Sequence, residues 1–178
     1  MHQAVLDFWF KEITPAKWWK KDAEFDQLIS ERFGKIHRQA NQGELYTWRT
    51  TPEGRLAEII VLDQFSRNIY RDSPKAFASD ALALVLAQEA ITHKADQHLA
   101  KHMLSFLYMP FMHSESLEIH QVATSLFKEA DLTDNYNFEL KHKAIIEQFG
   151  RYPHRNSVLG RSSTADEIEF LKQPGSSF

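Results

Sequence analysis

The chain has 178 residues, enough for one domain with its own core, and we expect a single helical domain over residues 1–172 with a frayed tail over residues 173–178. The absence of cysteine excludes disulfides, thiolate nucleophiles and sulfur-bound zinc, and it agrees with a reducing compartment, so we expect a cytoplasmic location. A formal net charge of −3 gives no general attraction to nucleic acid or anionic membranes, and no run of about 20 apolar residues predicts a transmembrane helix.

The first half of the chain carries helix signals in a clear order. Residues 1–12 are apolar around Phe8–Phe10, but they carry Asp7 and lack the basic flank and the small-residue cleavage site of a signal peptide. From Phe25 to Ile36, apolar residues recur every three or four positions, which predicts an amphipathic helix that ends near Gly43. Thr51 followed by proline is typical of a helix start, so we predict a helix over residues 52–70.

The second half continues the helical pattern. Further helices are predicted over residues 79–92, 97–108, 114–129, 134–149 and 164–171. Pro110 is expected to break or kink its helix, Gly150 to end one, and Thr164 with Glu167 to form a capping box. Because no strand pattern appears, the predicted fold is all-α: an antiparallel helical-hairpin array or bundle, tetratricopeptide-like without consensus repeats.

Four polar residues share one arc of the otherwise apolar helix predicted over residues 52–70. They are Asp63, Gln64, Arg67 and Asn68. This arc is either the wall of a polar pocket or a structural feature in which Asp63 pairs with Arg67 one turn away. In both cases a buried charge needs a partner, because a buried charge without one destabilises the protein by roughly 3–5 kcal/mol.

A second polar cluster, His113-Ser114-Glu115, follows an aromatic run. His113 and Glu115 are candidates for proton transfer, since histidine titrates near neutrality and a carboxylate can be tuned upward. The alternative is that Ser114 simply caps the next helix and the cluster serves packing.

A third cluster is rich in arginine and lies between Phe149 and Arg161. Arg151, Arg155 and Arg161 crowd a short loop together with His154. Guanidinium groups bind carboxylates and phosphates through two parallel hydrogen bonds, so this loop is the best candidate for a local anion site. Alternatively, these arginines bond helix-end carbonyls and pair with Asp63 or Glu115.

Metal and cofactor sites are not indicated. His98 and His102 are four residues apart on the helix predicted over residues 97–108, but no third ligand accompanies them, which favours a solvated helix face. Phosphate-loop, dinucleotide-fold and serine-hydrolase motifs are absent from the sequence. We therefore expect no metal and no cofactor.

Four motifs together resemble the bacterial family called domain of unknown function 924. They are Val5 to Phe10, Leu62 to Asn68, Pro110 to Glu115 and Phe149 to Asn156, in the family's order. The resemblance covers nearly the whole chain and implies an all-helical, tetratricopeptide-like fold with no established activity. The family pattern often has Gln-Arg shortly before the aromatic run, where this chain has Lys101-His102.

Our leading hypothesis is a site for a small anionic molecule in a polar cleft lined by the three polar clusters. The arginines at 151, 155 and 161 would bind the anion, and the residues from Asp63 to Asn68 would orient it. If the protein is an enzyme, the acid–base candidates are His113, Glu115, His142 and His154, although no reaction type is indicated.

The alternative hypothesis is a tetratricopeptide-like scaffold that binds a protein partner and in which these motifs are structural. An exposed apolar groove would be typical of such a scaffold. We expect neither nucleic acid nor membrane as a partner, and the sequence does not indicate an oligomeric state.

Overall fold

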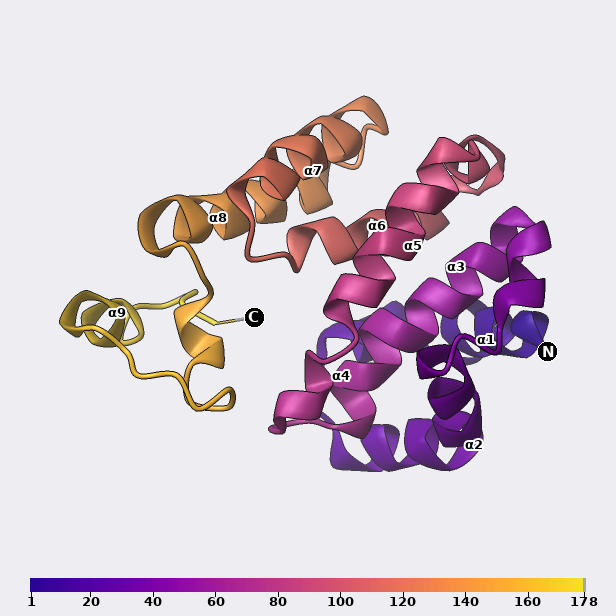
Figure 1. Cartoon of the computed structure of the whole chain (residues 1–178), viewed down its shortest axis with the longest axis horizontal. Coiled ribbons are helices and arrows are strands. Elements are labelled where there is room, and N and C mark those ends of the chain that lie inside the picture. Colours follow the sequence, from indigo (N-terminus) through magenta and orange to yellow (C-terminus); the bar gives the residue numbers. More distant parts are fainter. Residues whose placement is uncertain (178) are drawn as a thin grey trace. The chain divides into compact units, whose positions relative to one another are not determined.

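The computed structural model describes residues 1–177, and in this range it consists of helices and turns without a strand (Figure 1). The predicted all-α fold is confirmed. The chain divides into two compact units. The N-terminal unit comprises Met1–Arg71 and Lys75–Pro110, and the C-terminal unit comprises Asp72–Pro74 and the chain from Phe111 onward. The tetratricopeptide-like arrangement and the single domain over residues 1–172 stay predictions.

The N-terminal unit contains most of the helices. They are α1 (His2–Asp7), α2 (Ala23–Asn41), α3 (Pro52–Ile60), α4 (Ser66–Ile69), α5 (Asp80–Thr92) and α6 (Lys101–Met112), of which α6 extends two residues into the C-terminal unit. Two π-helical turns, Phe8–Glu12 and Val61–Phe65, follow α1 and α3 directly. Short 3-10 turns occupy Pro15–Trp19, Tyr46–Thr50 and Ala95–His98, and a fourth, Pro74–Ala76, begins at the last residue of the Asp72–Pro74 segment of the C-terminal unit.

The helix start predicted at Thr51 is confirmed. The Thr51 hydroxyl accepts a hydrogen bond from the Gly54 N–H at 3.1 Å, and Pro52 is the first helical residue. From there the chain stays helical through Ile69, as α3, a π-helical turn and α4. The predicted helix therefore exists, but a π-helical turn interrupts its regular period.

Aromatic rings fill the core of the N-terminal unit. The ring of Phe33 lies 5.0 Å from Phe8 and 4.9 Å from Phe65, and Trp9 packs edge-on against Phe106 at 5.6 Å. Burying such large side chains supplies most of the stabilisation of a small core, so this cluster fixes the π-helical turns at Phe8–Glu12 and Val61–Phe65 in place.

The helix predicted over residues 97–108 is wrong at its start and its end. Residues Ala95–His98 form a 3-10 turn, Leu99 is extended, and α6 begins only at Lys101. His98 and His102 therefore do not lie one turn apart on a common helix. Pro110 lies inside α6, which continues to Met112, so this proline does not end the helix where we expected.

The C-terminal unit is built on a helical hairpin. Helices α7 (Leu117–Glu129) and α8 (Thr133–Phe149) pack side by side, and a 3-10 turn (Pro153–Arg155) and α9 (Ala165–Phe170) follow (Figure 1). Gly150 ends α8 with a φ of 67°, a left-handed conformation that favours glycine, as predicted. The capping box of Thr164 with Glu167 is also confirmed.

The start of α7 differs from the prediction. We expected it at Ser114, but Ser116 is the N-cap and Leu117 the first helical residue. The Ser114 hydroxyl instead accepts from the Ser116 N–H at 3.2 Å, which makes a local turn before the helix.

One residue near the end of the chain, Ser176, bonds to Leu171, the residue that follows α9. Ser176 is buried, and its hydroxyl donates to the Leu171 carbonyl at 3.1 Å. The tail predicted to fray, residues 173–178, also includes Phe178, which lies outside the described residues. Within residues 1–177, no helix combines the length and the apolar character needed to cross a bilayer.

Candidate functional site

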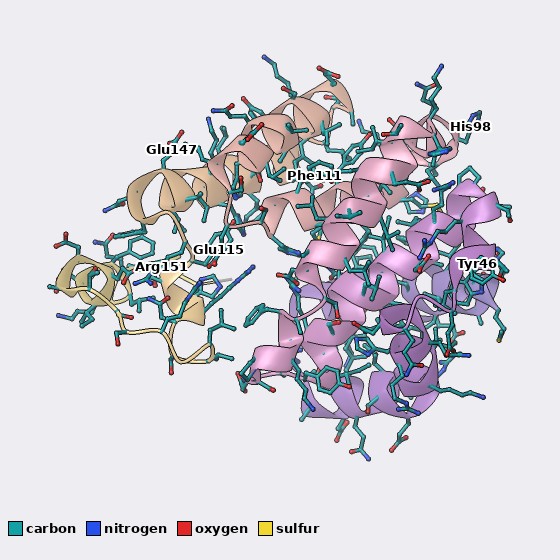
Figure 2. The ribbon with its side chains drawn as sticks, viewed as in Figure 1. Tyr46, His98, Phe111, Glu115, Glu147 and Arg151 are labelled. Carbon is teal, nitrogen blue, oxygen red and sulfur yellow. The ribbon has the colours of Figure 1, made fainter. Side chains whose placement is uncertain are left out.

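The eleven residues that we selected from the sequence divide between the two units. Asp63, Gln64, Arg67 and Asn68 belong to the N-terminal unit. The other seven belong to the C-terminal unit: His113, Glu115, His142, Arg151, His154, Arg155 and Arg161. Figure 2 shows two of these, Glu115 and Arg151.

In the N-terminal unit, Asp63 and Gln64 are buried on the π-helical turn Val61–Phe65. The Gln64 amide donates to the Asp63 carboxylate, and it also lies 3.1 Å from the Met109 sulfur. Asp63 is 1% exposed. Because a π-helical turn often marks a functional position, this buried carboxylate is a reasonable candidate for a role beyond packing.

Arg67 and Asn68 each contact an acidic residue of another helix. The Arg67 guanidinium donates two hydrogen bonds to the Asp80 carboxylate, at 2.8 and 3.1 Å, while its distance to Asp63 Oδ1 is 3.8 Å. Asn68 donates to Asp26 at 2.8 Å. Arg67 therefore lies closer to Asp80 on α5 than to Asp63, the partner expected from the sequence.

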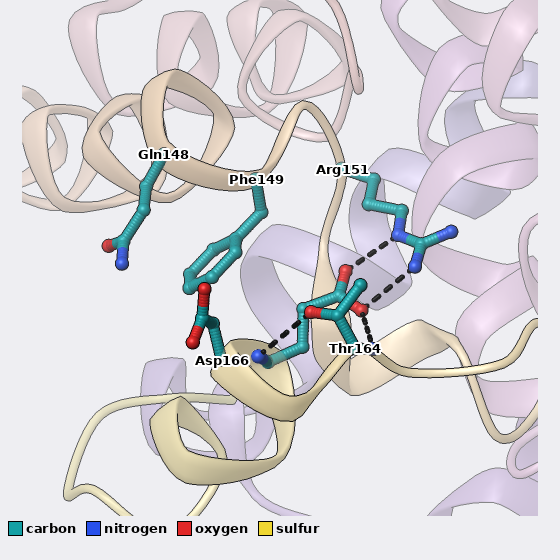
Figure 3. Close-up of a pocket in the computed structure, with 6 residues that line it drawn as sticks. Gln148, Phe149, Arg151, Thr164 and Asp166 are labelled. Carbon is teal, nitrogen blue, oxygen red and sulfur yellow. Dashed lines mark hydrogen bonds and ion pairs between the residues drawn. The ribbon is translucent and has the colours of Figure 1, made fainter.

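In the C-terminal unit, Arg151 is bound by the last helix. Its guanidinium donates to both carboxylate oxygens of Glu167, at 2.6 and 2.8 Å (Figure 3). These hydrogen bonds are the main reason that the pKa of Glu167 is lowered to about 2. Arg151 therefore ties the loop after α8 to the start of α9.

Arg161 binds the second carboxylate of the unit. It donates to both oxygens of Glu115, at 2.6 and 2.9 Å, and the Tyr152 N–H donates to the same carboxylate at 2.7 Å. Burial alone would raise the pKa of Glu115, but the hydrogen bonds from Arg161 and Tyr152 outweigh burial and hold this pKa below its usual value. Glu115 is therefore ionised at neutral pH, as a carboxylate that holds two loops together.

Basic side chains surround the buried ring of Tyr152. The Arg155 guanidinium lies 4.6 Å from the ring centre, and the rings of His154, His142 and His120 lie at 5.5, 5.8 and 6.2 Å. We call these five residues the Tyr152 cluster. Its members come from α7, α8 and the loop after α8, so the helical hairpin positions them.

His142 in this cluster is held neutral. Its Nδ1 donates to the Phe138 carbonyl at 2.8 Å, within α8. Burial lowers the pKa of His142 to about 3, the Phe138 hydrogen bond opposes this shift, and repulsion from His113, His120 and His154 adds to it. The influence of His113 means that it too lies within electrostatic range of the cluster.

His120 and Glu139 were missed in the sequence. Both are fully buried, and His120 Nδ1 lies 2.7 Å from Glu139 Oε1. His120 is in helical step with the buried Ala123 and Phe127. A polar residue on an apolar stripe was the signal that could have identified this buried pair.

A surface pocket of about 380 Å³ also lies in the C-terminal unit (Figure 3). It is lined by Gln148, Phe149, Arg151, Thr164, Asp166 and Glu167. Two carboxylates against one arginine do not suit an anion, and among the predicted site residues only Arg151 lines this pocket. Another pocket, of about 340 Å³, lies near Glu12 and Phe25 and includes none of them.

Metal ligation finds no support in the described part of the chain. Over residues 1–177, His, Asp and Glu side chains do not gather in threes as a metal site requires. His98 and His102 are both exposed, and His102 packs edge-on against Phe10 at 5.3 Å.

The chemistry available in the Tyr152 cluster is acid–base chemistry and the binding of negative charge. An ordinary histidine accepts and donates protons near neutrality, which His142 does not do because its pKa is lowered to about 3, and an arginine stacked on a tyrosine ring is fixed in direction. Glu115, in contrast, is a poor proton donor because its carboxylate is held ionised.

Comparison with known proteins agrees with the motifs. A family model described as "Bacterial protein of unknown function (DUF924)" matches residues 5–175. The solved structure of a protein of unknown function, ATU0120 from Agrobacterium tumefaciens, is similar, with 36% sequence identity, a TM-score of 0.92 and coverage of 97% of each chain. No curated protein matches the chain. The protein therefore belongs to the bacterial DUF924 family.

Proposed function

We propose that the C-terminal unit binds a small molecule with an anionic group at the Tyr152 cluster. The observation that carries this proposal is the gathering of Arg155 and three histidines around one ring. Arg155 carries the permanent positive charge of the cluster, and a bound carboxylate or phosphate would interact favourably with it, in addition to Glu115, which lies within electrostatic range of Arg155. Burial is the main cause of the lowered pKa of His142, and repulsion from His113, His120 and His154 adds to it.

The surroundings of the cluster support a preformed site. Arg151, through Nε and Nη2, and Arg161, through Nη1 and Nη2, each donate two hydrogen bonds to one glutamate, which fixes the loop that carries His154 and Arg155. A site formed before the ligand arrives loses less conformational entropy on binding. In this proposal Arg155 binds the anion, Arg151 and Arg161 shape the loop, and His113 and His154 are the groups available for proton transfer.

The test is a thermal-unfolding titration with inorganic phosphate, sulfate and small carboxylates at constant ionic strength. A specific anion should raise the melting temperature along a saturable curve. The rise should disappear in Arg155→Gln and persist in Arg38→Gln, which makes the same charge change at an exposed position of α2. A rise that never saturates, or that persists in Arg155→Gln, would contradict anion binding at this cluster.

A second candidate function is the interaction scaffold, in which the polar motifs only hold the fold together. The observation in its favour is that Arg67, Arg151 and Arg161 each form a double hydrogen bond with one carboxylate. Such pairs rigidify loops without any ligand.

The two candidates differ in what Arg155 does for stability. If Arg155 serves a ligand, Arg155→Leu should leave the ligand-free protein within about 1 kcal/mol of the wild type. If it neutralises a buried carboxylate, the same change should cost about 3–5 kcal/mol, because the carboxylate would remain buried without compensation. Urea midpoints without ligand decide between them, and a loss in the higher range would favour the scaffold.

A further inference from the structure

The position of one proton on His120 follows from its neighbours. His120 Nε2 lies 2.8 Å from the Ser114 carbonyl oxygen, which can only accept a hydrogen bond. The Tyr152 hydroxyl, 3.2 Å from the same nitrogen, donates its own hydrogen to the Met112 carbonyl at 2.6 Å. Nε2 therefore carries a proton and donates it to Ser114.

A second proton must lie between His120 and Glu139. His120 Nδ1 and Glu139 Oε1 are 2.7 Å apart, and two atoms that both lacked a proton would bring lone pairs together at this distance. The pair as a whole is therefore neutral. It holds one proton more than a neutral imidazole beside an ionised carboxylate would hold.

The surroundings place this shared proton on Glu139. The side chain is fully buried, and its other oxygen, Oε2, has no hydrogen-bond partner among the described residues. An ionised carboxylate with a bare oxygen in such a place would be strongly disfavoured. Burial also raises the pKa of Glu139, although His120 and Lys143 favour its charged form.

We propose that the Glu139–His120 pair is a pH-sensitive element that holds the Tyr152 cluster in shape while the shared proton is present and releases it when that proton is lost. The consequence for ligand binding rests on the proposed function, whereas the behaviour of the pair itself does not. His120 is suited to this role because it contacts both the segment after α6, at Ser114, and the loop after α8, at Tyr152.

Loss of the shared proton leaves no arrangement that satisfies all partners. If Nε2 keeps its proton, Nδ1 faces an ionised carboxylate lone pair to lone pair. If the proton moves to Nδ1, the carboxylate is satisfied but Nε2 can no longer donate to Ser114. In both cases the contact network changes, and in the second the Tyr152 hydroxyl can leave Met112 and donate to Nε2.

Other groups that face the pair influence the pH at which the shared proton is lost, but they do not alter what happens when it is lost. They are His142 and Lys143 on α8 and Tyr152 in the following loop, while the end of α6 contributes the Met112 carbonyl and the segment after it the Ser114 carbonyl. The positive charge of Lys143 favours the ionised carboxylate and moves the change to lower pH, whereas burial moves it to higher pH.

The test follows the His120 ring nitrogens by NMR in the whole, ligand-free protein while pH rises from about 6 to about 10, a range that extends above ordinary histidine titration. We expect a neutral ring with the proton on Nε2 near neutral pH, and a change of its tautomer or hydrogen bonding at alkaline pH. In Glu139→Gln, the amide N–H₂ donates to Nδ1 at every pH, so the change should be lost. A doubly protonated ring near neutral pH would overturn the assignment to Glu139, and an unaltered change in Glu139→Gln would overturn the role of the pair.

Lys143→Gln provides a second test at a partly exposed residue, should Glu139→Gln fail to fold. Removing the positive charge of Lys143 should shift the change of the His120 ring to higher pH, and an unshifted change would overturn the proposal.

Sulfate, whose charge is constant between about pH 6 and about pH 10, tests whether the state of the pair affects ligand binding. Its affinity for the wild type should be lost as the ring changes, and its affinity for Glu139→Gln should stay constant. If the wild type still binds sulfate after the His120 ring has changed, the pair does not control binding. If the protein binds no sulfate at any pH, the proposed function is contradicted, and the NMR result alone decides on the behaviour of the pair.

Discussion

His142 illustrates how burial and repulsion act together on one side chain. Its ring is buried in the hairpin of α7 and α8, donates to the Phe138 carbonyl, and lies among three other histidines. The folded protein therefore binds a proton at this ring much less readily than the unfolded chain does. This difference makes the stability of the protein depend on pH.

We expect acid to destabilise the protein through His142. The unfolded ring accepts a proton near pH 6.5, but the folded ring does so only near its pKa of about 3. Stability is thus complete above pH 6.5 and falls as pH drops toward about 3, by up to about 5 kcal/mol. Urea midpoints at pH 7, 5.5 and 4 should fall more steeply for the wild type than for His142→Gln. Parallel curves would show that the folded ring protonates normally.

Arg161 gives a second prediction, which concerns geometry rather than charge alone. Its two hydrogen bonds to Glu115 need the fork of a guanidinium, and the same carboxylate also holds the Tyr152 N–H. Arg161→Ala should destabilise the protein by about 2 kcal/mol, and Arg161→Lys should recover only part of this loss. Chemical denaturation at constant slope measures both.

The matched control is Lys172→Ala, which breaks a pair with Glu169 in which both side chains are well exposed. Solvent screens such a pair, so no measurable change is expected. If Arg161→Ala behaved like this control, the Glu115 pair would not be structural.

At the scale of helices, local signals were predictable and tertiary partners were not. The caps at Thr51, Gly150 and Thr164 depend on residues within a few positions of one another, and all three were predicted correctly. The partners of Arg67 and Asn68, in contrast, lie on α5 and α2, far away in the sequence. No periodic pattern contains that information.

The polar arc on the helix over residues 52–70 shows a second limit. It was drawn for a regular α-helix, but the π-helical turn Val61–Phe65 inserts an extra residue and changes the phase of the side chains that follow. Asp63 and Gln64 are buried, whereas Arg67 and Asn68 are only partly buried. The sequence therefore gives the types of the polar residues on this helix but not the directions in which their side chains point.

A substitution at Gly54 tests how closely α3 packs against the turn before it. A Cβ atom added there would lie 2.0 Å from the Trp48 carbonyl oxygen, which belongs to the backbone and cannot move aside easily. Gly54→Ala should therefore destabilise the protein by about 2 kcal/mol, although alanine is the better helix former. In α2, Gly34→Ala meets only the end of the Arg38 side chain at 3.8 Å, so the same change should stabilise by about 0.5–1 kcal/mol. Opposite signs for the two variants are expected, and melting temperatures measure them; equal signs would contradict the close packing at Trp48.

The way in which the chain connects the two units affects whether the whole protein unfolds in one step. One boundary falls inside α6, between Pro110 and Phe111, and the others lie on either side of the short segment Asp72–Pro74. None of these boundaries is a long chain rich in glycine and serine, which is what independent domains usually have. Because α6 continues across one boundary, we expect the chain to unfold as one cooperative system, and the single domain over residues 1–172 stays a prediction.

The tryptophans allow a direct test of this cooperativity. All four, Trp9, Trp18, Trp19 and Trp48, belong to the N-terminal unit, so tryptophan fluorescence reports that unit alone, whereas far-ultraviolet circular dichroism reports the helices of both. We expect the two signals to give coincident urea transitions. In Arg161→Ala, which alters only the C-terminal unit, the fluorescence midpoint should fall by the same amount as the dichroism midpoint, because cooperative unfolding transmits the loss to every probe. If the fluorescence midpoint stayed at its wild-type value while the dichroism transition split in two, the units would unfold separately and the chain would contain two domains.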